Sequence, residues 1–310
     1  MALSFGAKNV LPLLLLAGLV RNAEPQAEQT GGDYRLSVSV DLVALQATVH
    51  DRAGGYVSNL REQNFEVYED GIRQSIRLFR HEDVPVTVGL VVDHSGSMRR
   101  KLAQVTAAAR TFVQFSNPED QMFVVNFNEK ATLGLPDTIP FTAHSDELAR
   151  AIANAPATGQ TALYDAIVKA HERLRLGNRD RKALIVISDG GDNASARTLD
   201  EVLKLSDRST ALVYTIGIFD EQDEDRNPAV LRRLARATGG EAFFPEKLEE
   251  VVAICERIAR DIRHQYTIGY AANSNAKPGA WHAIRVVARG PGSGKLSVRT
   301  RSGYIAGGAK

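Results

Sequence analysis

The chain has one cysteine, few aromatic residues, no excess of either charge and no long apolar run. With Cys255 alone, an intrachain disulfide is excluded. This cysteine lies in a stretch with helical apolar spacing, so we expect a buried side chain rather than a reactive thiol. The 38 Lys and Arg residues balance 37 Asp and Glu residues, and no basic stripe is interleaved with aromatics. We therefore expect no nucleic-acid partner.

The first residues have the pattern of an export signal. Lys8 precedes an eleven-residue apolar stretch, Val10–Val20, and a polar segment follows it. This stretch is shorter than the ~20 residues that a membrane-spanning helix needs, so we expect no membrane span in the mature chain. The sequence predicts a signal peptide or short anchor over 1–23, a linker over 24–34, and a periplasmic, cell-envelope or extracellular location.

The middle of the chain, residues 85–262, alternates apolar runs with amphipathic stretches. This alternation predicts an α/β fold, a doubly wound and mostly parallel sheet with helices on both faces. The expected strands are Val86–Asp93, Met122–Phe127, Ala183–Ser188, Ala211–Ile218 and Ala242–Phe244. The expected helices are Arg99–Phe115, Asp146–Asn154, Ala162–Leu174, Leu199–Asp207, Ala229–Ala237 and Glu246–Arg263.

Two β-rich segments flank this core in sequence, 35–82 and 265–306. In the first, Asp70-Gly71 separates two strand-like runs, which is a strong hairpin signal. Each segment is too short to form an independent domain by itself. We expect both chain ends to pair into one small flanking β domain.

Five oxygen-bearing residues lie where strands of the core end or helices begin. Asp93, Ser95 and Ser97 follow the apolar run Val86–Val92, Asp189 follows another buried strand, and Thr161 precedes a helix. In open α/β sheets, ligands collect at the carboxyl ends of the strands. Carboxylates and hydroxyls without sulfur suit Mg²⁺ or Mn²⁺ better than zinc or copper. The sequence therefore predicts a metal site at this sheet edge.

Together the three motifs resemble the von Willebrand factor A domain with its metal-ion-dependent adhesion site. The Asp-x-Ser-x-Ser loop, the threonine loop and the strand-ending aspartate of that family fall on the five positions above without substitution. The flanking segments are similar to those of bacterial VWFA-related domain proteins. The resemblance implies a non-enzymatic binding module that holds Mg²⁺ or Mn²⁺ and captures an Asp or Glu side chain of a protein partner. It specifies neither that partner nor the number of subunits.

Four neighbouring residues are candidates for the rim of a partner-binding face: His94, Met98, Tyr164 and Asp192. We expect His94 to face solvent, and Asp192 to cap a loop rather than join the site. Packing is as plausible as a rim position for Met98 and Tyr164. The acidic stretch 220–226 lacks the glycine and closing glutamate of an EF-hand loop, so we expect a solvated surface loop.

Two other functions fit the same residues. In the first, the metal is structural and clips three loops of an envelope scaffold whose partners bind elsewhere. In the second, the metal activates water in a hydrolase. His94 is the only evident general base near the motifs, and phosphate-loop, dinucleotide and nucleophile-elbow motifs are absent from the sequence. These absences favour binding over catalysis.

Overall fold

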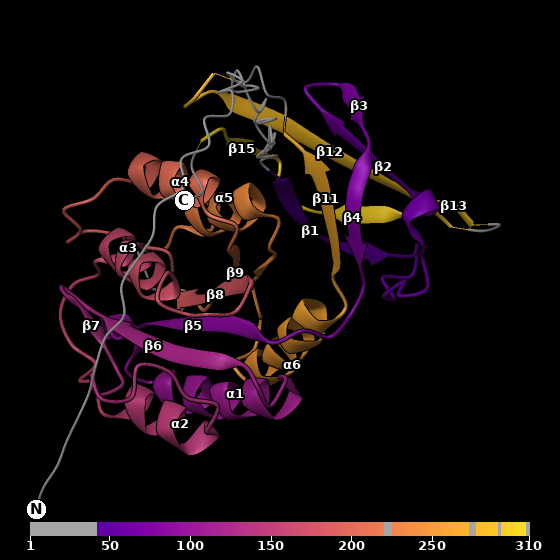
Figure 1. Cartoon of the computed structure of the whole chain (residues 1–310). Coiled ribbons are helices and arrows are strands. Elements are labelled where there is room, and N and C mark those ends of the chain that lie inside the picture. The colour runs from indigo at the N-terminus through magenta and orange to yellow at the C-terminus, as the bar shows by residue number, and fades with distance from the viewer. Residues whose placement is uncertain (1–41, 220–224, 273–276, 291–292, 308–310) are drawn as a thin grey trace, which may run out of the picture. The chain divides into compact units, whose positions relative to one another are not determined.

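The computed structural model describes residues 42–219, 225–272, 277–290 and 293–307, the last range from Ser293 to Lys295 by its backbone alone (Figure 1). The expected signal peptide and linker lie outside these residues, as does most of the acidic stretch after residue 219. Among the helices that the structure describes, none is long and apolar enough to cross a bilayer.

The α/β core is a six-stranded sheet in the order β10-β9-β8-β5-β6-β7. Its strands are β5 (Val86–Asp93), β6 (Gln121–Phe127), β7 (Ala131–Leu133), β8 (Arg181–Ser188), β9 (Leu212–Gly217) and β10 (Ala242–Phe243). The pairs β5–β6, β5–β8, β8–β9 and β9–β10 are parallel, and only β7 runs antiparallel, against β6. The predicted fold class is confirmed, whereas the edge strand β7 was not predicted.

Helices cover both faces of this sheet (Figure 1). One side carries α1 (Leu102–Phe115), α2 (Ser145–Ala153) and α6 (Glu250–Arg263), and the other α3 (Leu163–Leu174), α4 (Leu199–Arg208) and α5 (Pro228–Thr238). All eight residues of β5 are buried, so apart from Thr87 and the terminal Asp93 the strand lacks polar side chains and does not alternate. Cys255 is buried in α6, as predicted.

The two flanking segments pair with each other in two further sheets. Strand β1 is antiparallel to β11, and β2 is antiparallel to β12, so partners about 200 residues apart lie side by side. One sheet has the order β14-β1-β11-β4 and the other β13-β12-β2-β3, with β15 paired to β12. The bounds are β1 (Leu42–His50), β2 (Phe65–Glu69), β3 (Ile72–Gln74), β4 (Ile76–Arg80), β11 (Tyr266–Ala271), β12 (Trp281–Gly290), β13 (Ser293–Lys295), β14 (Ser297–Arg299) and β15 (Gly303–Ile305).

The Asp70-Gly71 hairpin is confirmed. Asp70 has φ 50° and Gly71 has φ 83°, the left-handed pair that a two-residue hairpin turn requires. The run after this turn, predicted as one strand, divides at Ser75: β3 stays with β2, and β4 crosses to pair with β11. Buried side chains between the sheets, Leu45, Phe65, Tyr266 and Ile268 among them, form a second core.

Candidate metal centre

Asp93 ends β5 and is fully buried. Its Oδ1 accepts a hydrogen bond from the backbone N–H of Ser95 at 2.8 Å, and its Oδ2 accepts one from the Ser188 hydroxyl at 2.6 Å. Burial raises the pKa of this carboxyl to about 6 despite those bonds. The last residues of two adjacent parallel strands, β5 and β8, therefore hold Asp93 at the sheet edge.

Two serines and a second carboxylate meet beside Asp93. A short 3₁₀ turn, η2 (Gly96–Met98), follows β5 and carries Ser97. The Ser95 and Ser97 hydroxyl oxygens lie 3.1 Å apart, and Ser97 donates a hydrogen bond to Asp189 Oδ2 at 2.8 Å. Asp189 Oδ1 accepts from the N–H of Gly191 at 3.0 Å, which orients the carboxylate at the end of β8.

Thr161 belongs to a third loop, which backbone hydrogen bonds tie to the other two. The N–H of Gly96 donates to Gly159 O at 3.3 Å, and the N–H of Asn193 donates to Thr161 O at 3.0 Å. Gly159 has φ 83°, and a Cβ there would lie 2.4 Å from the Glu129 carboxyl, so this turn requires glycine. The Thr161 side chain is buried at this edge, without a hydrogen bond to the other four predicted ligands.

The chemistry of this donor set fits a hard divalent cation. Asp93 is buried beside a second carboxylate, Asp189, and no cationic side chain is among the groups that shift its pKa. A buried carboxylate without a counter-charge is costly, whereas a bound cation would compensate it. The hydroxyls of Ser95 and Ser97 add neutral oxygen donors, the kind that Mg²⁺ and Mn²⁺ accept.

Two of the four predicted rim residues are buried and do not lie at a rim. His94 is 1% exposed, because its N–H bonds to Phe127 O on β6 and its carbonyl accepts from Thr158, which turns the ring into the protein. Both ring nitrogens are buried, and burial lowers the pKa of the imidazole. Met98 is fully buried in the main core. The expectation of a solvent-facing His94 was therefore wrong.

The other two rim candidates are half-buried. Asp192 accepts hydrogen bonds from the Ser195 hydroxyl at 2.6 Å and the Tyr164 N–H at 3.0 Å. The predicted loop-capping role of Asp192 is therefore confirmed, and it fixes the start of α3 beside Thr161. Burial raises the pKa of the Tyr164 hydroxyl, so it stays protonated at neutral pH.

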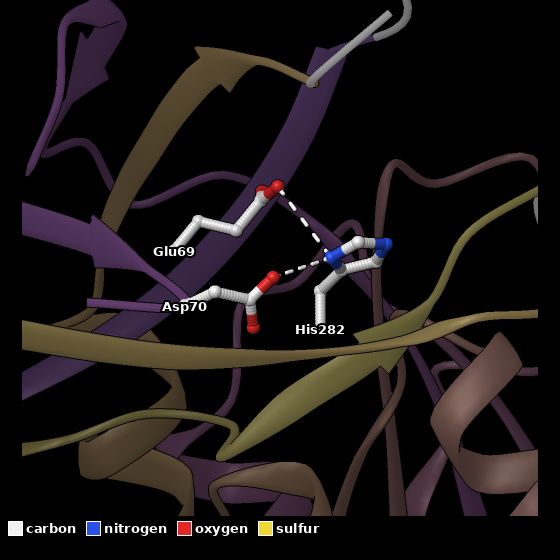
Figure 2. Close-up of side chains that lie close together, drawn as sticks. All are labelled: Glu69, Asp70 and His282. Carbon is white, nitrogen blue, oxygen red and sulfur yellow. Dashed lines mark hydrogen bonds and ion pairs between the residues drawn. The ribbon is translucent and has the colours of Figure 1, made fainter. Parts of the chain in front are cut away.

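A separate polar cluster lies in the paired β segments, where Glu69, Asp70 and His282 come together (Figure 2). His282 Nδ1 lies 2.7 Å from Asp70 Oδ2 and 3.8 Å from Glu69 Oε1. Asp70 also accepts from the N–H of Ala283 at 2.8 Å, and Glu69 Oε2 accepts from the Tyr270 hydroxyl at 2.5 Å. These bonds hold the β2–β3 turn against β12. Local sequence spacing gave no signal for this cluster, because His282 is 212 residues from Asp70 in the sequence.

Comparisons with known proteins agree with the fold. Residues 88–191 match the family model for the von Willebrand factor type A domain. Inter-alpha-trypsin inhibitor heavy chain H2 of Mesocricetus auratus is 28% identical over 171 residues, 51% of this chain. The chain spans only 18% of the length of that relative.

Two solved structures share the fold at low identity. The first is a von Willebrand factor type A protein from Catenulispora acidiphila, with a TM-score of 0.51, 13% identity, and coverage of 86% of this chain and 74% of that one. The second is proximal thread matrix protein 1 from the mussel byssus, whose MIDAS motif (metal-ion-dependent adhesion site) is occupied by zinc. Its TM-score is 0.51 at 15% identity, with 64% of this chain and 50% of that chain covered. The residues matched by the family model include most of β5 with Asp93, the serine turn, Thr161 and Asp189, and this part of the chain is a von Willebrand factor type A domain.

Proposed function

We propose that this protein is an exported binding module in which Asp93, Ser95, Ser97, Thr161 and Asp189 hold Mg²⁺ or Mn²⁺ for the capture of a carboxylate on a protein partner. The observation that carries the proposal is the chain of short oxygen contacts from Ser95 through Ser97 to Asp189, beside the buried Asp93. Three loops supply these oxygens, and the backbone bonds at Gly159 and Thr161 hold the loops together.

The balance of charge in this donor set favours capture of an anion. Two carboxylates and three hydroxyls neutralise less of the positive charge of a divalent ion than a site made of carboxylates alone would. When bound, Mg²⁺ keeps water wherever the protein supplies no ligand, and a partner Asp or Glu can take such a position. The Ser188 hydroxyl and the Ser95 N–H each donate to one oxygen of Asp93, which orients this carboxylate and leaves lone pairs available for the metal or a metal-bound water.

Binding without catalysis is supported by the position of His94. The sequence offered this residue as the general base of a hydrolase, but both of its ring nitrogens are buried. A base must reach the proton that it removes, directly or through one water. Export is supported by Lys8 and the apolar stretch Val10–Val20.

The first test is a thermal-shift titration with Mg²⁺, Mn²⁺, Ca²⁺ and Zn²⁺ against EDTA. Free metal at 100 times its Kd stabilises the folded state by about 2.7 kcal/mol, which raises Tm by roughly 5–10 °C for a domain of this size. Ser97→Ala should lose this shift. Ser206→Ala, which removes a buried hydroxyl without a hydrogen-bond partner in α4, is the matched control and should keep it.

Partner capture is tested separately, with a Glu-containing peptide titrated into the metal-loaded protein and into the EDTA-treated protein. We expect binding in Mg²⁺ or Mn²⁺ alone, and none to Ser97→Ala. A rise of Tm on addition of metal, without any metal-dependent peptide binding, would favour the alternative in which the metal is structural and only holds the three loops together. Equal Tm values with and without metal, in wild type and Ser97→Ala alike, would refute the metal site.

A further inference from the structure

A second recessed surface lies away from the predicted metal centre, at the carboxyl end of α5. It is a cavity of about 560 Å³ between the end of α5, the edge strand β10, and strands β12 and β14. That volume lies within the range of small-molecule sites, ~300–1,000 Å³. The chain reaches it at Gly239-Gly240, where a Cβ on Gly239 would lie 2.4 Å from the Arg301 backbone nitrogen. The end of α5 therefore packs directly against the segment that follows β14 at this cavity.

Positive charge dominates the lining. The arginines are Arg232, Arg236, Arg285, Arg299 and Arg301, and the only acidic side chain is Glu241. Arg299 forms ion pairs with Glu241 and Asp261, and Arg257 also pairs with Glu241. The one acid of the lining is thus already neutralised within the protein.

Among the residues that the structure describes, the other four arginines of the lining form no salt bridge with a carboxylate. Arg301 is 9% exposed, and its guanidinium donates only to carbonyls, those of Gly303 at 2.6 Å, Asp207 at 2.5 Å and Ser209 at 3.1 Å. These carbonyls and the nearby Asp207 carboxylate offset part of this charge, but no carboxylate of the described residues contacts the guanidinium directly. A buried guanidinium without a direct ion pair favours an anion in the adjacent cavity.

The exposed arginines are held in place on both walls. The Arg232 guanidinium lies 4.4 Å from the Phe244 ring centre on the α5 side, and Arg285 lies 3.9 Å from the Tyr68 ring centre on the β12 side. Stacking on an aromatic face orients a guanidinium and leaves its N–H groups available for a carboxylate. Arg236, one helical turn after Arg232, is the second arginine of α5 that lines the cavity. The walls thus present pre-oriented donors to an anionic ligand.

The geometry points to a binding site for an extended, acidic segment of a partner protein. A single phosphate would engage one or two of these arginines and leave most of the volume unfilled. Ile284, Val286 and Val298 also line the cavity, so a segment that carries apolar as well as acidic side chains suits it better than a small anion. Among the described strands, the two-residue strand β10 pairs with β9 alone, so its other edge is open to an extended chain.

The proposal is tested with a fluorescein-labelled (Glu-Val)₄ peptide, measured by anisotropy against the whole protein in EDTA. Its (Gln-Val)₄ analogue is the charge control. We expect (Glu-Val)₄ to bind with an affinity that falls with added salt, and the analogue to bind at least tenfold more weakly. Replacing both Arg232 and Arg236 by Gln should raise Kd about 5- to 30-fold, since two lost contacts of about 0.5–1 kcal/mol each convert to that change.

Arg233→Gln is the matched control, because Arg233 is an exposed arginine of the same helix that pairs with Asp200 and does not line the cavity. Arg285→Gln tests the opposite wall without altering α5. Equal Kd values for wild type and both cavity variants would overturn the proposal, as would an equal loss in Arg233→Gln.

Measuring in EDTA separates this site from the proposed metal site, which also attracts carboxylates. Binding that appears only in Mg²⁺ and disappears in Ser97→Ala would place the peptide at the metal and overturn the arginine site. Binding of a sulfated hexasaccharide, sensitive to Arg236, with no binding of (Glu-Val)₄ would also overturn it, in favour of a polysaccharide ligand.

Discussion

Loss of the buried ring of His171 should make the protein more resistant to acid. His171 lies on α3, the helix that begins just after Thr161, and it is 4% exposed with no partner for Nε2 among the described residues. Burial lowers the pKa of this imidazole from 6.5 to about 4. Between these two pH values the unfolded chain binds a proton that the folded chain refuses, so stability falls as the pH falls.

The size of this effect follows from the two pKa values. The stability is fully present above pH 6.5 and is lost as the pH falls toward 4, at up to about 1.4 kcal/mol per pH unit. At pH 5 the loss amounts to about 2 kcal/mol relative to pH 7.5. Other titrating groups act equally on wild type and variant, so the difference between the two isolates His171.

The assay is urea unfolding of wild type and His171→Leu at pH 7.5, 6 and 5. We expect the free energy of unfolding of wild type to fall by about 2 kcal/mol more than that of His171→Leu over this range. His144→Gln, which removes an exposed ring ahead of α2, controls for the loss of a titratable group. The reasoning is refuted if wild type and His171→Leu lose stability in parallel.

Two further substitutions test the ion pair between β14 and α6 and the packing around β5. Arg299→Met should cost about 3 kcal/mol in urea unfolding, because it leaves Asp261 buried without its ion pair, and adding Asp261→Asn should restore much of that loss. Additive losses would contradict this coupling. Gly89→Ala should cost about 1–3 kcal/mol, since the new Cβ would lie 2.5 Å from Phe123 Cζ and 2.7 Å from Leu184 Cδ2. A wild-type urea midpoint for Gly89→Ala would show that these side chains move aside freely.

Much of the fold could be predicted where local pattern and burial agree. β5 has the predicted bounds, because a strand buried on both faces needs an uninterrupted apolar run. The turn at Asp70-Gly71 was also predictable, because left-handed backbone at both positions favours these two residues. Strand β7 was missed, since its three residues are held by pairing with β6 rather than by a pattern of their own.

In the candidate site, too, the features that depend on local sequence could be predicted, and those that depend on distant contacts could not. The sequence singled out the residues that the structure brings together at the ends of β5 and β8, since strand termini and oxygen donors can both be read locally. Their role as metal ligands stays a prediction. The burial of His94 could not be read locally, because it depends on a hydrogen bond to Phe127 of the next strand. The arginine cavity depends on contacts between chain segments that are far apart in sequence.

Helix α5 connects the two proposed binding surfaces. At its start, the N–H of Asn227 donates to Asp189 O at 3.0 Å, and the Asn227 side chain caps the helix at Val230. At its end, Arg236 and Gly239 line the arginine cavity. Eleven helical residues extend about 16 Å. An extended chain covers that distance in about five residues at ~3.3 Å each, so one acidic partner segment could engage both surfaces only if its two anionic positions are at least that far apart.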